Sequence, residues 1–105
     1  MTENKYQAKI IKQLEDMFPG CLVVKLDTSY RQGLPDLLIL WEKFWAVLEV
    51  KPTKDSLSQP NQEYYIEQLN EMSFAAYIYP ENEVEVLSAL QQAFKSPGRT
   101  RVSQS

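Results

Sequence analysis

Two carboxylates and one lysine in the middle of the chain are the residues best suited to chemistry. Asp36 opens the apolar run 36–41, and Glu49 lies near the end of a second apolar run, 44–50, with Lys51 directly after it. The two-residue gap between the runs predicts a tight β-hairpin, although it lacks the Asn-Gly pair that favours such turns. In that hairpin Asp36 faces Glu49, with Cβ atoms about 5 Å apart, and Lys51 shares the face of Glu49 at the same end of the sheet.

Opposed carboxylates on an apolar sheet repel each other unless a cation offsets their charge. The chain has no His and one Cys, so zinc sites of the usual nitrogen and sulfur type, histidine triads and an internal disulfide framework are excluded. The oxygen ligands that remain favour Mg²⁺, with Mn²⁺ as a substitute. The alternative is a loop aspartate and an ordinary surface Glu-x-Lys pair, and the residues alone leave both interpretations open.

The pattern of apolar residues around these groups predicts a small α/β domain. Helical spacing recurs over 3–18, about 59–72 and 83–94, and strand-like runs cover 21–27, 36–41, 44–50 and 73–79. The order α-β-β-β-α-β-α predicts a small central mixed β-sheet flanked by helices, with a right-handed crossover between its last two strands. We expect one domain over 1–94 and a polar, mobile tail over 95–105.

Capping signals and apolar stripes refine these helices. Thr2 is the expected N-cap of the first helix and Ser58 that of the second, with Pro60 in its first turn. The expected apolar faces of the second and third helices consist of Tyr65, Ile66, Leu69 and Met72, and of Val84, Leu87, Leu90 and Phe94.

Composition limits the setting of the protein. There are 11 Lys and Arg against 14 Asp and Glu, and this net charge of −3 argues mildly against a nucleic-acid partner. No apolar run reaches membrane-spanning length, and the polar N-terminus is unlike a signal peptide. We therefore expect a soluble, intracellular, cytoplasmic protein with no membrane partner.

Three short motifs together resemble a known family. Gly33-Leu34-Pro35-Asp36, then Glu49-Val50-Lys51, then Gln59-Pro60-Asn61-Gln62 are similar to the motifs of the PD-(D/E)XK nuclease superfamily. More narrowly, the chain resembles the VRR-NUC group, the virus-type replication-repair nucleases, in its minimal stand-alone, phage-like form. The resemblance implies a restriction-endonuclease-like core and, if the protein is viral, a place in the host cell cytoplasm.

The resemblance also implies a role for each matched residue. Asp36 and Glu49 would bind the metal through their carboxylates, with the backbone carbonyl of Val50 as a further ligand. Lys51 would orient or activate the attacking water and neutralise phosphate charge. Gln62 matches the family's helical glutamine near the active site.

Two further positions have both a local and a family argument. Gln62 precedes Tyr65 and Ile66 by three and four residues, so helical spacing alone places it on the sheet-facing stripe, with a helix-capping glutamine as the alternative. Glu3 begins the first helix, where many superfamily members carry another acid that acts on the metal, often through water.

Several residues are candidates for contact with DNA. Arg31 lies in the loop that enters the active strand, so it is a candidate phosphate contact, and Tyr30 beside it could stack on a base. Lys54 is a third candidate. The alternatives are packing for Tyr30 and a solvated surface for the cations. Further cations that could contact phosphates are Lys5, Lys9, Lys12, Lys25, Arg99 and Arg101.

Together these residues imply a Mg²⁺-dependent, structure-selective DNA endonuclease that hydrolyses phosphodiester bonds. By resemblance, it would resolve four-way (Holliday) junctions as a homodimer, because symmetric cutting needs two active sites. Trp41 and Trp45 flank the hairpin turn and suit either such a dimer interface or the core. The alternatives are a nuclease acting on flaps, ends or duplex without junction preference, and a non-catalytic DNA-binding module of the same fold.

Overall fold

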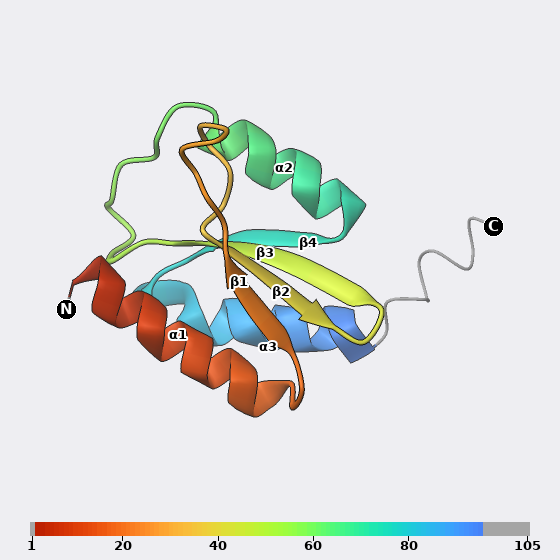
Figure 1. Ribbon diagram of the computed structural model, residues 1–105. Helices are drawn as coiled ribbons and strands as arrows, with labels where there is room; N and C mark the ends of the chain where they lie inside the picture. Colours follow the sequence, from red (N-terminus) through yellow and green to blue (C-terminus); the bar gives the residue numbers. More distant parts are fainter. Residues whose placement is uncertain (1, 96–105) are drawn as a thin grey trace.

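The computed structural model describes residues 2–95 and has three α-helices and four strands in the predicted order. The elements are α1 (Glu3–Met17), β1 (Leu22–Lys25), β2 (Leu37–Trp41), β3 (Phe44–Val50), α2 (Gln62–Met72), β4 (Phe74–Ile78), the 3-10 turn η1 (Pro80–Asn82) and α3 (Glu83–Lys95). Helices α1 and α3 lie on one side of the sheet and α2 on the other (Figure 1). The predicted α/β class is therefore confirmed.

The predicted tail lies almost wholly outside the described residues. Lys95 is the last residue of α3 rather than the first of the tail, and 96–105, with Arg99 and Arg101, are not described. No helix among residues 2–95 is long and apolar enough to cross a bilayer.

The sheet has the order β1-β2-β3-β4, antiparallel across its first three strands and parallel between β3 and β4. The β2–β3 register pairs Leu37 with Leu48 and Trp41 with Phe44, which is the register predicted for the hairpin. Of the two turn residues only Glu42 has a positive φ, 56°, the pattern of a type II′ turn. Continuing this register by one residue places Asp36 opposite Glu49.

The hydrophobic core fills the space between the sheet and the helices α1 and α3. Tyr6, Ile10 and Leu14 form the buried stripe of α1, as the helical spacing predicts. Trp41 belongs to this side of the sheet, because its ring stacks on Phe94 with centroids 6.0 Å apart and its indole N–H donates to the backbone of Pro19. Of the two tryptophans, Trp41 is thus used in packing within the chain.

Helix α2 begins later than the sequence predicts. Its N-cap is Asn61, in a left-handed conformation with φ 70°, and neither Ser58 nor Pro60 lies within the helix or caps it. The hydroxyl of Ser58 instead donates to Tyr77 of β4 at 3.4 Å. The first backbone bond of the helix runs from Tyr65 to Asn61, because residues 59–62 form a separate turn. The N-cap Thr2 of α1 is confirmed, since its side chain accepts from the Lys5 amide.

For two residues, the prediction that they belong to the apolar, buried faces of their helices is wrong. Met72 is 58% exposed and Val84 is 82% exposed. On α2, Tyr65, Ile66 and Leu69 are half-buried rather than buried. In α3 the buried residues Val86, Leu87, Leu90 and Phe94 form one face at helical spacing, and Val84 lies to the side of that face.

A buried polar contact joins the first helix to the last. The Tyr6 hydroxyl donates to the Glu83 carboxylate at 3.0 Å, and the Lys9 ammonium lies 3.5 Å from the same oxygen. Burial, the hydrogen bond and the charge of Glu83 raise the pKa of Tyr6, so the hydroxyl remains a donor at any physiological pH.

Replacing Tyr6 by Phe removes the strongest partner of a buried carboxylate, so we expect the free energy of unfolding to fall by about 1–2 kcal/mol. Urea unfolding followed by circular dichroism measures this difference. The control is Tyr30→Phe, because Tyr30 is 81% exposed and should change stability by less than about 0.5 kcal/mol. Equal stabilities for the two variants would contradict the assignment.

Candidate active site

A cavity of about 370 Å³ lies at the end of the sheet where β2 begins and β3 ends. Residues from four separate segments line it: the start of α1, the loop before β2, the end of β3 and the start of α2. The side chains brought together there include Glu3, Asp36, Glu49, Lys51 and Gln62. The sequence therefore predicted which acids, lysine and glutamine would share one site.

Gln62 bridges the carboxylate of Glu49 and the ammonium of Lys51. Its amide N–H donates to Glu49 Oε2 at 2.7 Å, and its carbonyl oxygen accepts from the Lys51 ammonium at 3.0 Å. All three side chains are buried, with 4–8% of each exposed. A buried amide with both ends satisfied is rigid, so Gln62 sets the distance between the carboxylate and the ammonium.

Lys51 is held by three acceptors on different segments. Besides Gln62, its ammonium donates to the Leu57 carbonyl at 3.1 Å and lies 3.5 Å from Glu49 Oε2. The contact with Leu57 was missed by the sequence reasoning, because a backbone acceptor leaves no signal in residue type. It ties the loop after β3 to the site.

Asp36 is oriented by the backbone of the neighbouring strand. Its Oδ2 accepts from the Val50 amide at 2.9 Å, in the place where a ladder bond would otherwise form. In an extended strand the N–H and C=O of one residue point to the same side, so the Val50 carbonyl also faces Asp36. The next amide, of Lys51, donates the other way, to Ile78 of β4. This orientation agrees with the predicted ligand role of the Val50 carbonyl, which stays a prediction.

Burial raises the proton affinity of all three carboxyl groups of the cavity, and the charge of Asp36 raises that of the other two further. Burial, and then the charge of Asp36, raise the pKa of Glu49 to about 7, against the opposing effects of Lys51 and Gln62. Burial raises the pKa of Asp36, and burial together with Asp36 raises that of Glu3. Glu3, at the first turn of α1, therefore lies close enough to feel the charge of Asp36, and its action on a metal stays a prediction. The cavity is short of positive charge.

One oxygen of the site has no partner. Glu49 Oε1 is buried and accepts no hydrogen bond, although Oε2 of the same carboxylate is fully used. Within residues 2–95 no three acidic side chains converge into a complete metal cage. Two carboxylates, a backbone carbonyl and open cavity space nevertheless suit Mg²⁺, which keeps several of its waters and takes one or two carboxylates from the protein.

Gly33 explains why a glycine precedes the Pro-Asp pair. It has φ +97°, and a Cβ on it would lie 2.8 Å from Asn61 Cβ and 2.9 Å from the Pro60 carbonyl oxygen. The loop before β2 therefore packs directly on the turn before α2. This contact fixes the aspartate, which follows the loop, relative to the glutamine, which opens the helix.

The predicted DNA-contacting residues lie around the cavity rather than in it. Tyr30 and Arg31 are exposed on the loop before β2, whose next residues Gln32 and Gly33 line the cavity. Lys54 lines a different hollow, which it shares with Lys51. On α1, Lys9, one of the further cations named as possible phosphate contacts, forms an ion pair with Glu83.

Comparison with known proteins gives one informative likeness. No protein-family model matches the sequence, and no curated protein matches it. A solved structure described as a VRR_NUC domain is similar to this chain, with a TM-score of 0.61 and 21% identity over 90% of this chain and 95% of that one. This likeness shows that the chain has the VRR_NUC fold, as the motifs predicted.

The raised pKa of Glu49 has a consequence for stability in metal-free buffer. The unfolded carboxyl titrates near 4.5 and the folded one near 7, so folding is penalised increasingly as pH rises between these values. Glu49→Gln should remove the penalty and keep the contact with Gln62. We expect the variant to exceed the wild type in unfolding free energy by about 1–3 kcal/mol at pH 8, and the excess to shrink towards pH 4.5.

Urea unfolding at several pH values with EDTA measures this difference. Glu67→Gln is the matched control, since Glu67 is exposed on α2 and the same change should produce no such trend. A Glu49→Gln variant that is no more stable than the wild type at pH 8 would contradict the raised pKa of Glu49.

Proposed function

We propose that this chain is a Mg²⁺-dependent DNA endonuclease that hydrolyses phosphodiester bonds. The observation that carries the proposal is the half-buried Asp36 opposite the buried Glu49, with Lys51 beside them in the same cavity and with Glu49 Oε1 left without a partner. A structural role would favour satisfied polar atoms, and a buried carboxylate oxygen without a partner is costly. The VRR_NUC fold supports a nuclease in particular.

The metal would be held by Asp36, by Glu49 through Oε1, and by the Val50 carbonyl, with Glu3 acting through water. A divalent cation at this position supplies charge stabilisation to the phosphate and lowers the pKa of water. Asp36 Oδ2 is already engaged by the Val50 amide, which leaves its other oxygen for the cation.

Lys51 would orient the attacking water and offset charge that develops on the phosphate. It is suited to this because its ammonium is fixed by acceptors on two segments and borders the cavity. Gln62 would act as a positioning residue, since it holds Lys51 and Glu49 together without needing to touch the phosphate.

We further propose that the substrate is branched DNA, with the four-way junction as its preferred form, and that the enzyme acts as a homodimer. A domain of this size offers little surface for reading base sequence, so DNA shape is the more accessible feature. Paired cuts across a four-way junction need two sites related by two-fold symmetry.

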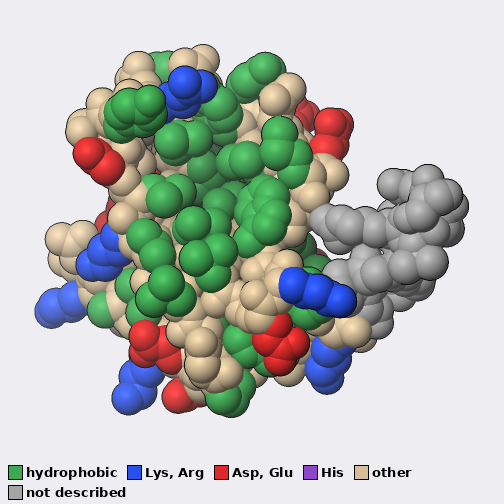
Figure 2. Space-filling view, turned by 45° about the vertical axis from the view of Figure 1, so that its right-hand side comes forward, with side chains coloured by type: hydrophobic (Ala, Val, Ile, Leu, Met, Phe, Trp, Pro, Cys, Tyr) green, Lys and Arg blue, Asp and Glu red, His purple; other side chains and the backbone are tan. Residues whose placement is uncertain are grey.

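An uncovered part of the sheet supports the dimer. Leu40 of β2 pairs with Leu22 of β1 and Trp45 of β3, so all three share the face that carries α2. Helix α2 contacts β4 and leaves this region open, with Leu22 59% and Leu40 38% exposed. Figure 2 shows hydrophobic side chains gathered across the middle of one face, with charged side chains at its margin. An uncharged apolar surface is complementary to itself, as a two-fold interface requires.

Cleavage of a labelled four-way junction and its matched linear duplex tests the nuclease proposal. With Mg²⁺ the wild type should cut the junction selectively, and Asp36→Ala, Glu49→Ala and Lys51→Ala should each lower the rate at least ~100-fold. Lys51→Ala should bind DNA in Ca²⁺ nearly as well as the wild type. Lys43→Ala, in the hairpin turn at the far end of the sheet, is the control for loss of one lysine.

Equal cutting of junction and duplex would remove the junction preference and leave a general nuclease. DNA that is bound but never cut would contradict the enzymatic proposal and favour a non-catalytic module.

Analytical ultracentrifugation tests the dimer. The wild type should sediment as a dimer, and a double variant, Leu22→Asp with Leu40→Asp, as a folded monomer, because two charges would be buried without partners at the interface. Val84→Asp is the control, since Val84 is 82% exposed on α3, on the other side of the sheet. A monomeric wild type, or a double variant that remains dimeric, would refute the proposed interface.

A further inference from the structure

We propose that a hollow on the β4 side of Lys51 is a subsite for the DNA phosphate adjacent to the one that is cut. The inference rests on the proposed nuclease function and adds a ligand site to it. The hollow has a volume of about 180 Å³ and is bordered by Lys51, Thr53, Lys54, Ser58, Tyr77 and Tyr79, among others.

The position of this hollow follows from the sheet register. Glu49 pairs with Tyr77 in the parallel β3–β4 ladder, so the tyrosines of the hollow flank the site on the side away from Asp36. Lys51 lines both the catalytic cavity and the hollow. A strand of DNA whose phosphate lies at Asp36 and Glu49 can therefore place a neighbouring phosphate beyond Lys51.

The chemistry of the hollow suits an anion. Its other lining side chains are hydroxyls and the Lys54 ammonium, and no carboxylate lines it. Hydroxyl donors and lysine are common phosphate contacts in protein–DNA complexes. The Lys54 ammonium has no ion-pair partner among residues 2–95, so its charge remains available.

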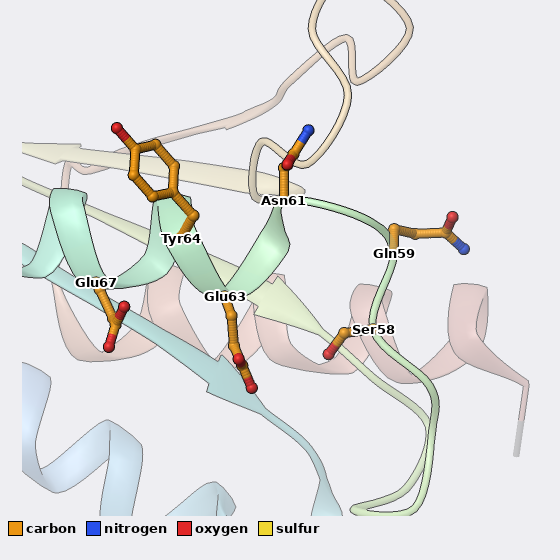
Figure 3. Close-up of a pocket in the computed structure, with 6 residues that line it drawn as sticks. All are labelled: Ser58, Gln59, Asn61, Glu63, Tyr64 and Glu67. Carbon is orange, nitrogen blue, oxygen red and sulfur yellow. The ribbon is translucent and has the colours of Figure 1, made fainter.

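A third hollow on the same loop has the opposite character. It has a volume of about 480 Å³ and is lined by Glu63 and Glu67 of α2, with Ser58 and Gln59 at its edge. Figure 3 shows both carboxylates projecting from the same side of the helix. A phosphate chain that leaves the catalytic cavity is repelled there and attracted towards Lys54, which selects one path for the strand.

The loop that carries Lys54 is fixed before any ligand binds. The backbone amide of Lys54 donates to the Glu81 carboxylate at 3.3 Å, and the backbone amide of Asp55 donates to the Thr53 hydroxyl at 2.8 Å. The Ser58–Tyr77 contact, at 3.4 Å, joins the far end of the loop to β4. These contacts reduce the ordering that phosphate binding would otherwise require.

The test combines a protein variant with a DNA variant. After the cleavage position is mapped, the phosphates on either side of it are replaced one at a time by neutral methylphosphonates. Binding is followed by fluorescence anisotropy in Ca²⁺, and cleavage in Mg²⁺. We expect one neighbouring position at which the neutral group weakens wild-type binding roughly fivefold to tenfold, with KM raised more than kcat is lowered.

Lys54→Gln should weaken binding of unmodified DNA by a similar factor and should be insensitive to the methylphosphonate at that one position. Lys43→Gln, with the same loss of charge at the far end of the sheet, should keep the full wild-type response. Tyr77→Phe should weaken binding of unmodified DNA by roughly twofold to threefold, through one hydroxyl alone.

Two results would overturn the subsite. In the first, Lys54→Gln binds unmodified DNA as tightly as Lys43→Gln does. In the second, the methylphosphonate weakens the binding of Lys54→Gln by the same factor as that of the wild type, so that the two losses multiply. Failure of the nuclease proposal looks different: the wild type would bind DNA and cut none of the substrates. Anisotropy on unmodified DNA, with Lys54→Gln compared against Lys43→Gln, would then still show whether Lys54 contributes to DNA binding.

Discussion

The confinement of a half-buried and a buried carboxylate, Asp36 and Glu49, opposite each other at one end of a small sheet is the constraint on which the rest of the site depends. Asp36 and Glu49 come from paired strands, so neither can move away without breaking the hairpin. Their repulsion is offset in part by Lys51 and by the amides of Val50 and Gln62. Because the offset is incomplete, the pKa of Glu49 is raised to about 7, and one of its oxygens has no hydrogen-bond donor. Such repulsion persists only where the surrounding structure imposes it, and a cation bound there would offset it.

The fold imposes this repulsion with few elements. The hairpin register sets the acids opposite each other, and the parallel pairing of β3 with β4 brings α2 back over the end of the sheet. The contact of Gly33 with the turn before α2 then fixes the glutamine against the aspartate loop. The two strand pairings are made by the backbone, and the Gly33 contact involves the backbone of Pro60 and Asn61. A chain of 105 residues can therefore hold a rigid site, although its sheet has only four strands.

The sequence predicted those parts of the molecule that follow from periodicity and pairing. Two apolar runs with a two-residue turn allow one register, so the meeting of Asp36 and Glu49 could be deduced before the structure. The start of α2 could not, because Ser58 and Pro60 satisfy the usual capping signals while the real cap, Asn61, uses a left-handed backbone that tertiary contacts impose. The acceptor for Lys51 on Leu57 and the hydroxyl-lined hollow beside it depend on the path of a loop, and loop paths are not encoded in periodicity.

The most direct test of the account is the location of a bound cation. Crystals soaked with Mn²⁺ and measured at its absorption edge would give an anomalous peak at the metal. We expect a peak within coordination distance of Asp36, of Glu49 Oε1 and of the Val50 carbonyl, and its loss in crystals of Glu49→Gln. An empty cavity in fully soaked crystals, or a peak held by other residues, would contradict the claim that these carboxylates form a metal site.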